Sequence, residues 1–561
     1  MNWHNLISTL RRLTSLLQCI VLLTLPNLYA TLFVKDLKHS LTPTIIGTAL
    51  VTLFVVLISR HPRYILLVCA PFILGVPVIC VLMSQVGAQV NRYAILIVST
   101  GNPEELGRFL NAAVIAGLST LAMAAVLWFL LRNVTSQTVP WQARMGLGAS
   151  SLALLGVILG PDLISSDKNR SINAAYKLAT LYPAGTLYEG WNAWKIQKDL
   201  AERNNTVARV SRGMRISPPV KKRSVHVLLI GESARFKSLS VNGYSRDTTP
   251  LLRMRKDLVW FQDMISGATI TRQSVPIIMT GLPADKFDLT RNSPSITSIA
   301  RAAGYDTAWF STQYRQGLAT KASAYFASDA ADYRFLCLEI GQTHFVNSAK
   351  DEQLIPLLKE QLDHSKKDVF IVLHTMGSHW LFTARYPKEF EKFPTEGLDP
   401  DAILQGRMTP PQTREKMLNA YDNALIYTDW CVNSMLEEVA KRGDLSTFWY
   451  LPDHGENGVD NVGSPFRHGF VTRDVMHVPA FAWFSPAYRN AYPDIVQRIE
   501  SHAKEPLMSR MLFHTLLEVT GIASKSLNET LSLANPNFHP GHGLVMSING
   551  RMVNYDKEVR D

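Results

Sequence analysis

The sequence VHVLLIG, residues 225–231, is a short apolar run that leads directly into Glu232 and Ser233. A run of this length, rich in apolar residues and bounded by turn residues, is typical of a buried strand. Four more β-rich runs alternate with helical stretches further along the chain: Thr307–Ser311, Val369–His374, Thr447–Leu451 and Pro479–Ser485. This alternation predicts an α/β domain with a largely parallel sheet over residues 224–561.

Three of the predicted strands end directly in residues that can do chemistry. These ends are GES at 231–233, HTMGSH at 374–379 and PDHGE at 452–456. In open α/β sheets ligands bind beyond the carboxyl ends of the strands, so we expect the three ends to converge on one site. The converging carboxylates and imidazoles are Glu232, Asp453, His454, His374 and His379, with His468 a short way downstream.

This set of side chains predicts a metal centre. Carboxylates and imidazoles are the ligands that zinc accepts where thiolates are absent, and bound zinc can activate a hydroxyl and neutralise a phosphoryl oxygen. Taken singly, Glu232 is as readily a charge at a helix N-terminus, and Asp453-His454 is as readily part of a turn. Three strand ends with the same ligand chemistry favour the metal centre. A hydroxyl is offered nearby in the sequence by Thr269, Thr271 or Ser274.

The N-terminal part of the chain is dominated by apolar runs. Crossing a bilayer takes about 20 helical residues, and a signal sequence would account for only one run. We expect an α-helical membrane domain of about five transmembrane helices, at roughly Leu13–Val34, Ile45–Ser59 (short unless its flanks contribute), Tyr64–Val86, Ala112–Leu131 and Met145–Leu163. The predicted organisation is a transmembrane domain over 1–163, a junction and linker over 164–223, and a catalytic domain over 224–561.

The net charge bears on the binding partners, and the cysteine content bears on disulfide bonds. The net charge is +11, but much of the excess is scattered rather than gathered in a patch, so we expect contact with lipid headgroups and no nucleic-acid partner. The five cysteines form no CxxC pattern. Cys337 and Cys431 are the only two outside the apolar region, and whether they form a disulfide stays open.

Several motifs in one order carry a resemblance to a known family. The segment IGESAR at 230–235 is followed by NGYSRDTTP at 242–250 and by TRQSVP at 271–276. HTMGSH at 374–379 with RYP at 385–387, YDN at 421–423 and DHGE at 453–456 then follow. The ordered set resembles the bacterial phosphoethanolamine transferases, and the similarity covers nearly the whole chain.

The resemblance implies an alkaline-phosphatase or sulfatase-like α/β domain that faces the periplasm from the bacterial inner membrane. It implies zinc, one ion or two, held by Glu232, Asp453 and His454, with Thr271 as nucleophile and fourth contact. Phosphoethanolamine would pass from phosphatidylethanolamine through a phospho-threonine to a cell-envelope glycan or glycolipid. His379 and His468, and less firmly His374, correspond to a second cluster that binds substrate phosphate or a second zinc. Glu105, in the loop TGNPEE at 100–105, corresponds to a substrate-contacting acidic residue.

The acceptor is less well defined. We expect the lipopolysaccharide core or lipid A, with transfer to a periplasmic glucan, or glycerol-phosphate transfer on the same fold, as alternatives. Few cysteines, Ser233 in place of a threonine, and Ser311-Thr312-Gln313 in place of an asparagine-rich stretch depart from the lipid A enzymes. A non-enzymatic membrane transporter or sensor is the alternative of another class, and it is the least expected because the apolar runs are almost uncharged.

Flanking cations predict the orientation. With the N-terminus inside, six arginines are cytoplasmic, namely Arg11, Arg12, Arg60, Arg63, Arg132 and Arg144, and four cations lie outside, namely Lys35, Lys38, Arg92 and Arg108. This bias and an odd number of spans place the catalytic domain outside the cytoplasm. A C-terminal alkaline-phosphatase fusion should therefore be active, and a C-terminal fluorescent fusion exported by the general secretory route should be dark. The reverse pattern would show that the number of spans is even.

Overall fold

The computed structural model describes residues 3–33, 41–86, 95, 110–134, 138–164, 181–210, 215–216, 222–314, 321–337, 349–399, 410–458 and 468–559. The described residues divide into two compact units, one within residues 1–199 and the other within residues 200–561. The predicted boundaries at residues 163 and 223 stay predictions.

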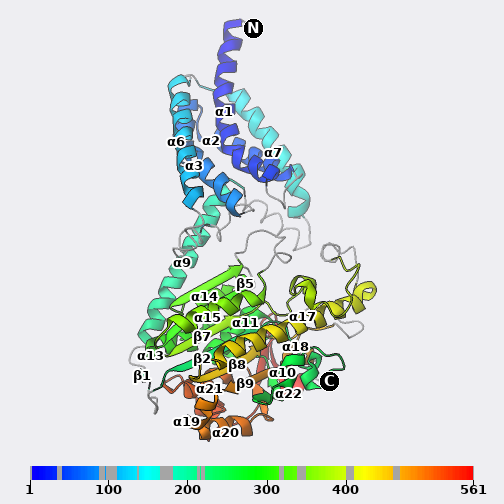
Figure 1. Ribbon diagram of the computed structural model, residues 1–561. Coiled ribbons are helices and arrows are strands. Elements are labelled where there is room, and N and C mark those ends of the chain that lie inside the picture. Colours follow the sequence, from blue (N-terminus) through cyan, green and yellow to red (C-terminus); the bar gives the residue numbers. More distant parts are fainter. Residues whose placement is uncertain are drawn as a thin grey trace. The chain divides into compact units, whose positions relative to one another are not determined.

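The first unit is helical (Figure 1). Its long helices are α1 (Trp3–Phe33), α2 (Thr42–Ile58), α3 (Pro62–Val86), α6 (Leu110–Asn133) and α7 (Trp141–Ile164). Each predicted apolar run falls on one of these helices. Among the described residues, α1, α3, α6 and α7 are long and apolar enough to cross a membrane, and α2 is the shorter apolar helix.

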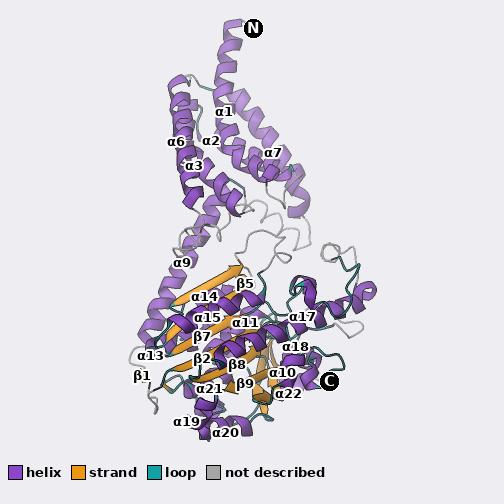
Figure 2. Cartoon of the chain, viewed as in Figure 1, coloured by secondary structure: helices purple, strands orange, loops and turns teal. Residues whose placement is uncertain are grey.

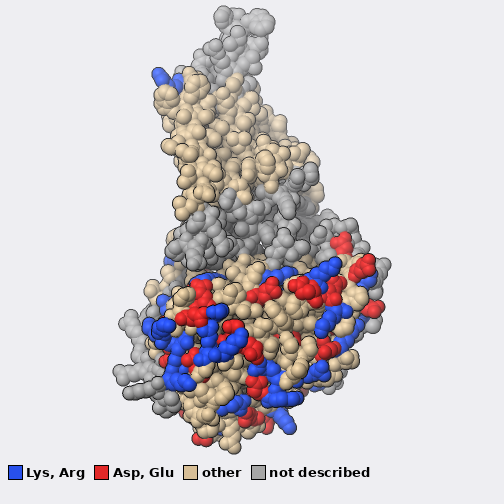
Figure 3. Space-filling view, in the orientation of Figure 1, with Lys and Arg blue, Asp and Glu red and all other residues tan. Residues whose placement is uncertain are grey.

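The surface of this unit fits a lipid environment. Large apolar side chains on α6 and α7 stay exposed, with Leu118 at 64%, Leu121 at 69% and Val157 at 74%. Figure 3 shows almost no charged residue on the described part of this unit, whereas cations and anions are interspersed over the other unit. An apolar surface of this extent is stable where hydrocarbon replaces water, so the helices form a membrane domain.

The second unit is built on a seven-stranded sheet in the order β3-β9-β8-β2-β7-β5-β6. The strands are β2 (Ser224–Gly231), β3 (Leu258–Phe261), β5 (Asp306–Tyr314), β6 (Asp332–Cys337), β7 (Val369–His374), β8 (Leu445–Pro452) and β9 (Ala480–Phe484). All five predicted strands are present. β8, β2, β7, β5 and β6 run parallel, while β9 is antiparallel to both β8 and β3. The strands β3 and β6 were not predicted from the sequence.

Helices cover both faces of this sheet (Figure 2). Leu228 and Ile230 of β2 pack into one core with α11 (Thr271–Thr280), α13 (Ile296–Ala303) and α21 (Met511–Val519). Val227 and Leu229 pack into the opposite core with α15 (Leu354–His364) and α17 (Pro410–Ala440). Burial on both faces explains why the β2 sequence is continuously apolar rather than alternating.

Shorter elements complete the second unit. Three two-stranded sheets pair β1 (Arg215–Ile216) with β11 (Ile522–Ala523), β4 (Asp263–Ile265) with β10 (Pro506–Met508), and β12 (Leu544–Met546) with β13 (Met552–Asn554). The short helices are α10 (Pro250–Met254), α12 (Phe287–Thr290), α14 (Lys321–Ala327), α18 (Arg473–Met476), α19 (Pro486–Ala491), α20 (Pro493–Ser501) and α22 (Tyr555–Glu558). Cys337 and Cys431 are free, buried thiols, so they form no disulfide here.

The helix α9 (Ala184–Val210) joins the second unit through a buried ion pair. The guanidinium of Arg203 lies 2.8 Å from Asp329 Oδ2, and both side chains are at most 1% exposed. The Asp329 carboxylate also accepts a hydrogen bond from Ser295, and Arg203 stacks on the Phe326 ring. Burial raises the pKa of Asp329 to about 6 although Arg203 opposes it. Within the second unit, the pair therefore holds the C-terminal part of α9 against the segment that carries Asp329.

Removing the cation should leave Asp329 as an uncompensated buried charge. We expect Arg203→Met to lower the free energy of unfolding by about 3 to 5 kcal/mol. The same substitution at Arg489, whose pair with Glu500 is a third to a half exposed, should cost less than about 1 kcal/mol. Thermal unfolding of the full chain in detergent would measure the difference, and equal melting temperatures for the two variants would contradict the structural role.

Candidate metal centre

Glu232 leaves the end of β2 through a tight bend that other residues hold in place. Ser233 has φ of +56°, in the left-handed region. The Glu232 carbonyl accepts hydrogen bonds from the backbone N–H and the hydroxyl of Ser378, both at 3.1 Å. Gly377 has φ of +46°, and a Cβ there would lie 2.7 Å from the Glu232 carbonyl oxygen. Only glycine allows this close approach of the two strand-end loops.

Asp453 and His454 leave the end of β8 beside Glu232. Parallel pairing sets Gly231 opposite Pro452, so the next residues of the two strands emerge side by side. The His454 Nε2 atom lies 3.5 Å from Glu232 Oε1 and 3.3 Å from Asp453 Oδ2. One ligand atom from each of the three residues lies within 4.8 Å of the others. The predicted convergence of these two strand ends is confirmed.

The histidine presents its lone pair to the cluster. His454 Nδ1 lies 2.8 Å from the Gly455 carbonyl oxygen, an acceptor, so this nitrogen carries the proton. Nε2 is then an acceptor that faces both carboxylates. A backbone carbonyl that fixes the tautomer in this way is the usual arrangement around a metal-binding histidine.

The electrostatics of the cluster call for a cation. Burial, with Asp453 nearby, raises the pKa of Glu232 to about 7, and burial raises the pKa of Asp453 to about 6. Burial, with His468 nearby, lowers the pKa of His454 to about 4. Asp453 Oδ2 has no hydrogen-bond donor among the described residues. Two buried carboxylates, a neutral imidazole and an orphaned oxygen fit a divalent ion such as zinc.

Thr271 is the hydroxyl that lies at this cluster. Its Oγ1 donates to Glu232 Oε2 at 3.1 Å and lies 3.4 Å from His454 Nε2. Thr271 is the first residue of α11, where the helix macrodipole favours negative charge and phosphate. Thr269 Oγ1 and Ser274 Oγ are buried and have no hydrogen-bond partner among the described residues. We call Glu232, Asp453 and His454 the metal-binding set. Of the three hydroxyls offered by the sequence, Thr271 is the one that lies within hydrogen-bond distance of this set.

Two supporting residues were not predicted. Gln313 Nε2 donates to Glu232 Oε2 at 2.8 Å and to the Thr375 carbonyl at 2.9 Å, which fixes the carboxylate. Its signal was available, because it continues the predicted strand Thr307–Ser311 into a fourth polar end. Asp351 accepts from the N–H groups of Met376 and Gly377 at 2.8 Å each and holds that loop. It lies in a 3-10 turn far from the motifs, where nothing in the sequence marks it.

A second group of polar side chains lies next to His454. The His468 ring is 4.2 Å from the His454 ring and 5.9 Å from the His379 ring, centroid to centroid. Burial disfavours the charged form of His468, but Glu456, whose Oε2 is 3.2 Å from Nδ1, outweighs it and raises the pKa to about 9. Burial lowers the pKa of His379 well below its usual value. This group therefore combines a cationic and a neutral imidazole beside the metal-binding set.

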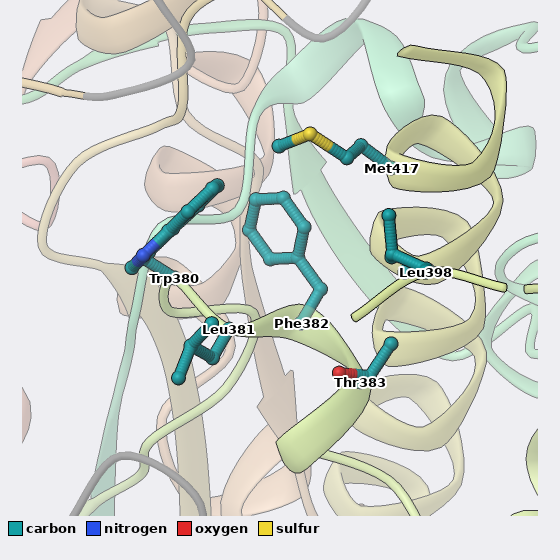
Figure 4. Close-up of a pocket in the computed structure, with 7 residues that line it drawn as sticks. Trp380, Leu381, Phe382, Thr383, Leu398 and Met417 are labelled. Carbon is teal, nitrogen blue, oxygen red and sulfur yellow. The ribbon is translucent and has the colours of Figure 1, made fainter. Parts of the chain in front are cut away.

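Two predicted residues remain, His374 and Glu105. His374 ends β7 with its side chain in the core, edge-on to Trp309, and its ring nitrogens have no partner among the described residues. Glu105 falls outside the described residues. A small apolar pocket of about 10 Å³ is lined by Trp380, Leu381 and Phe382, which come directly after His379 in the sequence, and by Met417 (Figure 4). It has room for no more than about one water, so it is a packing defect rather than a ligand site.

Comparison with known proteins identifies the family. Residues 224–522 match the family described as Sulfatase, which is more than half of the chain. The chain therefore belongs to the sulfatase family. The predicted resemblance to the phosphoethanolamine transferases is also confirmed. The chain is 28% identical to phosphoethanolamine transferase EptA of Escherichia coli K12 over 62% of each chain, so it spans under two thirds of that relative. It is 24% identical to EptC of the same strain over 81% of this chain and 79% of that one.

Solved structures share the fold. The C-terminal periplasmic domain of EptC from Escherichia coli, in complex with Zn, superposes with a TM-score of 0.52 at 22% identity, covering 62% of this chain and 96% of that one. The integral membrane lipooligosaccharide phosphoethanolamine transferase A of Neisseria meningitidis gives a TM-score of 0.50 at 21% identity, covering 91% and 98%. The second match includes the helical unit, so the architecture of membrane helices followed by a sulfatase-like domain is shared.

Zinc binding should weaken as the pH falls. The ion must displace protons from carboxyls whose pKa values are about 7 for Glu232 and about 6 for Asp453. Below about pH 7, where Glu232 takes up a proton, and more steeply below about pH 6, where Asp453 does too, the affinity should therefore drop by about tenfold per pH unit for each proton displaced. Metal analysis after equilibrium dialysis at several pH values would measure it, and a pH-independent affinity would contradict the assignment.

The ligand set itself is tested at neutral pH. Asp453→Ala should lose zinc, because it removes a ligand oxygen and leaves Glu232 and His454 alone. His374→Gln should keep zinc when folded, since its ring lies in the core. Equal zinc in wild type and Asp453→Ala, or zinc lost from folded His374→Gln, would show that the ligands have been misassigned.

Proposed function

We propose that the chain is a zinc-dependent phosphoethanolamine transferase of the bacterial inner membrane, with its catalytic unit in the periplasm. The observation that carries the proposal is the contact of the Thr271 hydroxyl with Glu232 and His454 at the cluster that fits a divalent ion. The relatives named phosphoethanolamine transferase support the group transferred. The donor would be phosphatidylethanolamine, and the helical unit would keep the site at the lipid surface that holds it.

The first half of the reaction would transfer the headgroup to the protein. Zinc bound by Glu232, Asp453 and His454 would lower the pKa of the Thr271 hydroxyl and neutralise a phosphoryl oxygen. Thr271 Oγ1 attacks the donor phosphorus, its proton passing to Glu232 Oε2, to which it already donates. The bond from phosphorus to the glycerol oxygen breaks, and His468, held cationic by Glu456, supplies the proton that diacylglycerol takes away.

The second half would regenerate the hydroxyl. An acceptor oxygen attacks the phosphorus of phospho-Thr271, and the neutral imidazole of His468 or His379 takes the acceptor proton. The bond from phosphorus to Thr271 Oγ1 breaks, and that oxygen recovers a proton from Glu232. The N-terminus of α11 favours the negative phosphodiester in the interval because its free N–H groups and dipole point toward it.

The acceptor proposed is the lipopolysaccharide core or lipid A, and a periplasmic glucan is the alternative. Ser233 and the two free thiols Cys337 and Cys431 differ from the pattern of the lipid A enzymes, and they favour the enzymes that modify the lipopolysaccharide core or a glucan. Mass spectrometry of lipopolysaccharide and of periplasmic glucans, from cells with and without the gene, separates the cases by which fraction gains a phosphoethanolamine mass. Glycerol-phosphate transfer is recognised by its donor. Activity with phosphatidylglycerol, and none with phosphatidylethanolamine, would identify it.

Thr271→Ala should abolish transfer while leaving the fold and the zinc in place. The substitution removes the nucleophile, so turnover should fall by orders of magnitude, while loss of one hydroxyl costs about 1 kcal/mol of stability. Peptide mass spectrometry after incubation with phosphatidylethanolamine should find the added mass on Thr271 in wild type only.

The matched control is Thr269→Ala, two residues away, whose buried hydroxyl has no hydrogen-bond partner in the described part of the chain. It should keep turnover within a few fold of wild type. Added mass on Thr269 or Ser274, or near-normal turnover in Thr271→Ala, would identify a different nucleophile.

A further inference from the structure

The loop that carries Thr271 is hydrogen-bonded to the C-terminal segment 541–559. The N–H of Met546 in β12 donates to the Gly267 carbonyl at 3.0 Å, and the N–H of Thr269 donates to the Met546 carbonyl at 3.1 Å. The Met546 side chain packs on Ala268 and Ile277, on either side of Thr271 in the chain. The backbone of the loop is therefore held by a strand more than 270 residues away in sequence.

A histidine without a role in the chemistry ties this segment down. His542 Nδ1 lies 2.6 Å from Asp556 Oδ1 of α22, and Nε2 lies 3.2 Å from Asp263 Oδ1 of β4. The two ring nitrogens face different carboxylates, so the group is a bridge between two elements and not a chelate for one ion. His542 is 7% exposed and lies edge-on to Tyr555.

The charges make the bridge ionic. Burial disfavours a charged His542, but the nearby carboxylates of Asp263, an ion-pair contact, and Asp556, a hydrogen-bonded contact, outweigh it and raise the pKa of the imidazole. The same contact with His542 lowers the pKa of Asp263. Asp263 begins β4, which ends at Ile265, one residue before the Ser266–Thr271 loop. The bridge thus joins the start of the Ser266–Thr271 loop to segment 541–559. The β12 strand of that segment pairs with the middle of the loop.

We propose that His542 is a positioning residue, which clamps segment 541–559 onto β4 and so holds Thr271 against the metal-binding set. The inference rests on the proposed function in one respect, the role of Thr271 as nucleophile. The effect of the clamp on the mobility of the loop is measured by hydrogen exchange, which needs no turnover. A loosened loop leaves the zinc ligands in place but moves the attacking oxygen, and small misplacements of a reacting group are costly.

The test compares two charge reversals on the same short helix of the full-length chain. Asp556→Lys places a cation beside His542 and breaks the bridge. Glu558→Lys makes the same charge change two residues on, where the exposed carboxylate pairs with Arg551 and accepts from the Asn554 N–H. Both side chains are substantially exposed, 59% and 42%, so neither reversal buries a charge. Asp556→Glu keeps the carboxylate and is the conservative variant.

Three quantities are measured for each variant. Amide hydrogen exchange of the peptide covering 266–271 should quicken in Asp556→Lys and stay at the wild-type rate in Glu558→Lys and Asp556→Glu. Zinc content should stay equal in all four proteins. With phosphatidylethanolamine vesicles as donor, kcat should fall about tenfold in Asp556→Lys while KM stays within about twofold. His542→Gln, which removes the cation, should reproduce this pattern.

The outcomes separate the two proposals. Wild-type exchange in Asp556→Lys and His542→Gln overturns the clamp. Faster exchange with unchanged kcat overturns the positioning role, and an equal loss of kcat in Glu558→Lys reduces the effect to surface charge. A wild type with no transferase activity defeats the proposed function, while exchange in the 266–271 peptide still decides whether the bridge holds the loop.

Discussion

Two carboxylates, Glu232 and Asp453, leave neighbouring parallel strands and are buried next to one another in this fold, each at most 1% exposed. Their positions follow from the register of β2 and β8, which sets Gly231 against Pro452. Like charges in a low dielectric repel and lose hydration, so this arrangement persists only with protons or a cation on it. The surroundings serve this constraint: His454 turns a lone pair inward, Gln313 donates to Glu232, and Ser233 adopts a left-handed bend.

The same constraint orders the elements around the sheet. β7 lies on the other side of β2, and its end carries the loop whose Ser378 donates to the Glu232 backbone. Asp351 holds that loop through its N–H groups, which places His379 within reach of His468. The helix that begins at Thr271 packs on the face of β2 that carries Leu228 and Ile230, and it brings its positive end to the cluster from that face. Each contributor comes from a different part of the sequence, and the sheet is what brings them together.

Much of this was predictable from the sequence, for a physical reason. Continuous apolar runs mark strands buried on both faces, and in parallel strands the residue after each run must lie at one edge. Glu232, Asp453 and His454 were found in this way, whereas the region of α9 was predicted only as part of a junction and linker. The strands β3 and β6 were not found, because β3 is only four residues long and both strands mix half-buried with buried positions. The burial of the His374 ring beside Trp309 was not predicted, because a position at a strand end does not reveal to which face of the sheet a ring points; its role at the site stays a prediction.

The glycine at position 377 has a consequence for how such enzymes diverge or are redesigned. A loop that follows a strand is ordinarily the freest part of an α/β fold to exchange, and acceptor preference is naturally sought there. Here the backbone of one loop rests on the backbone of another, with no room for a single methyl group between Gly377 and the Glu232 carbonyl. A graft of residues 374–379 from a relative is therefore also a change at Glu232, and swaps that keep this glycine and its neighbour Ser378 are the ones that leave the cluster of Glu232, Asp453 and His454 intact.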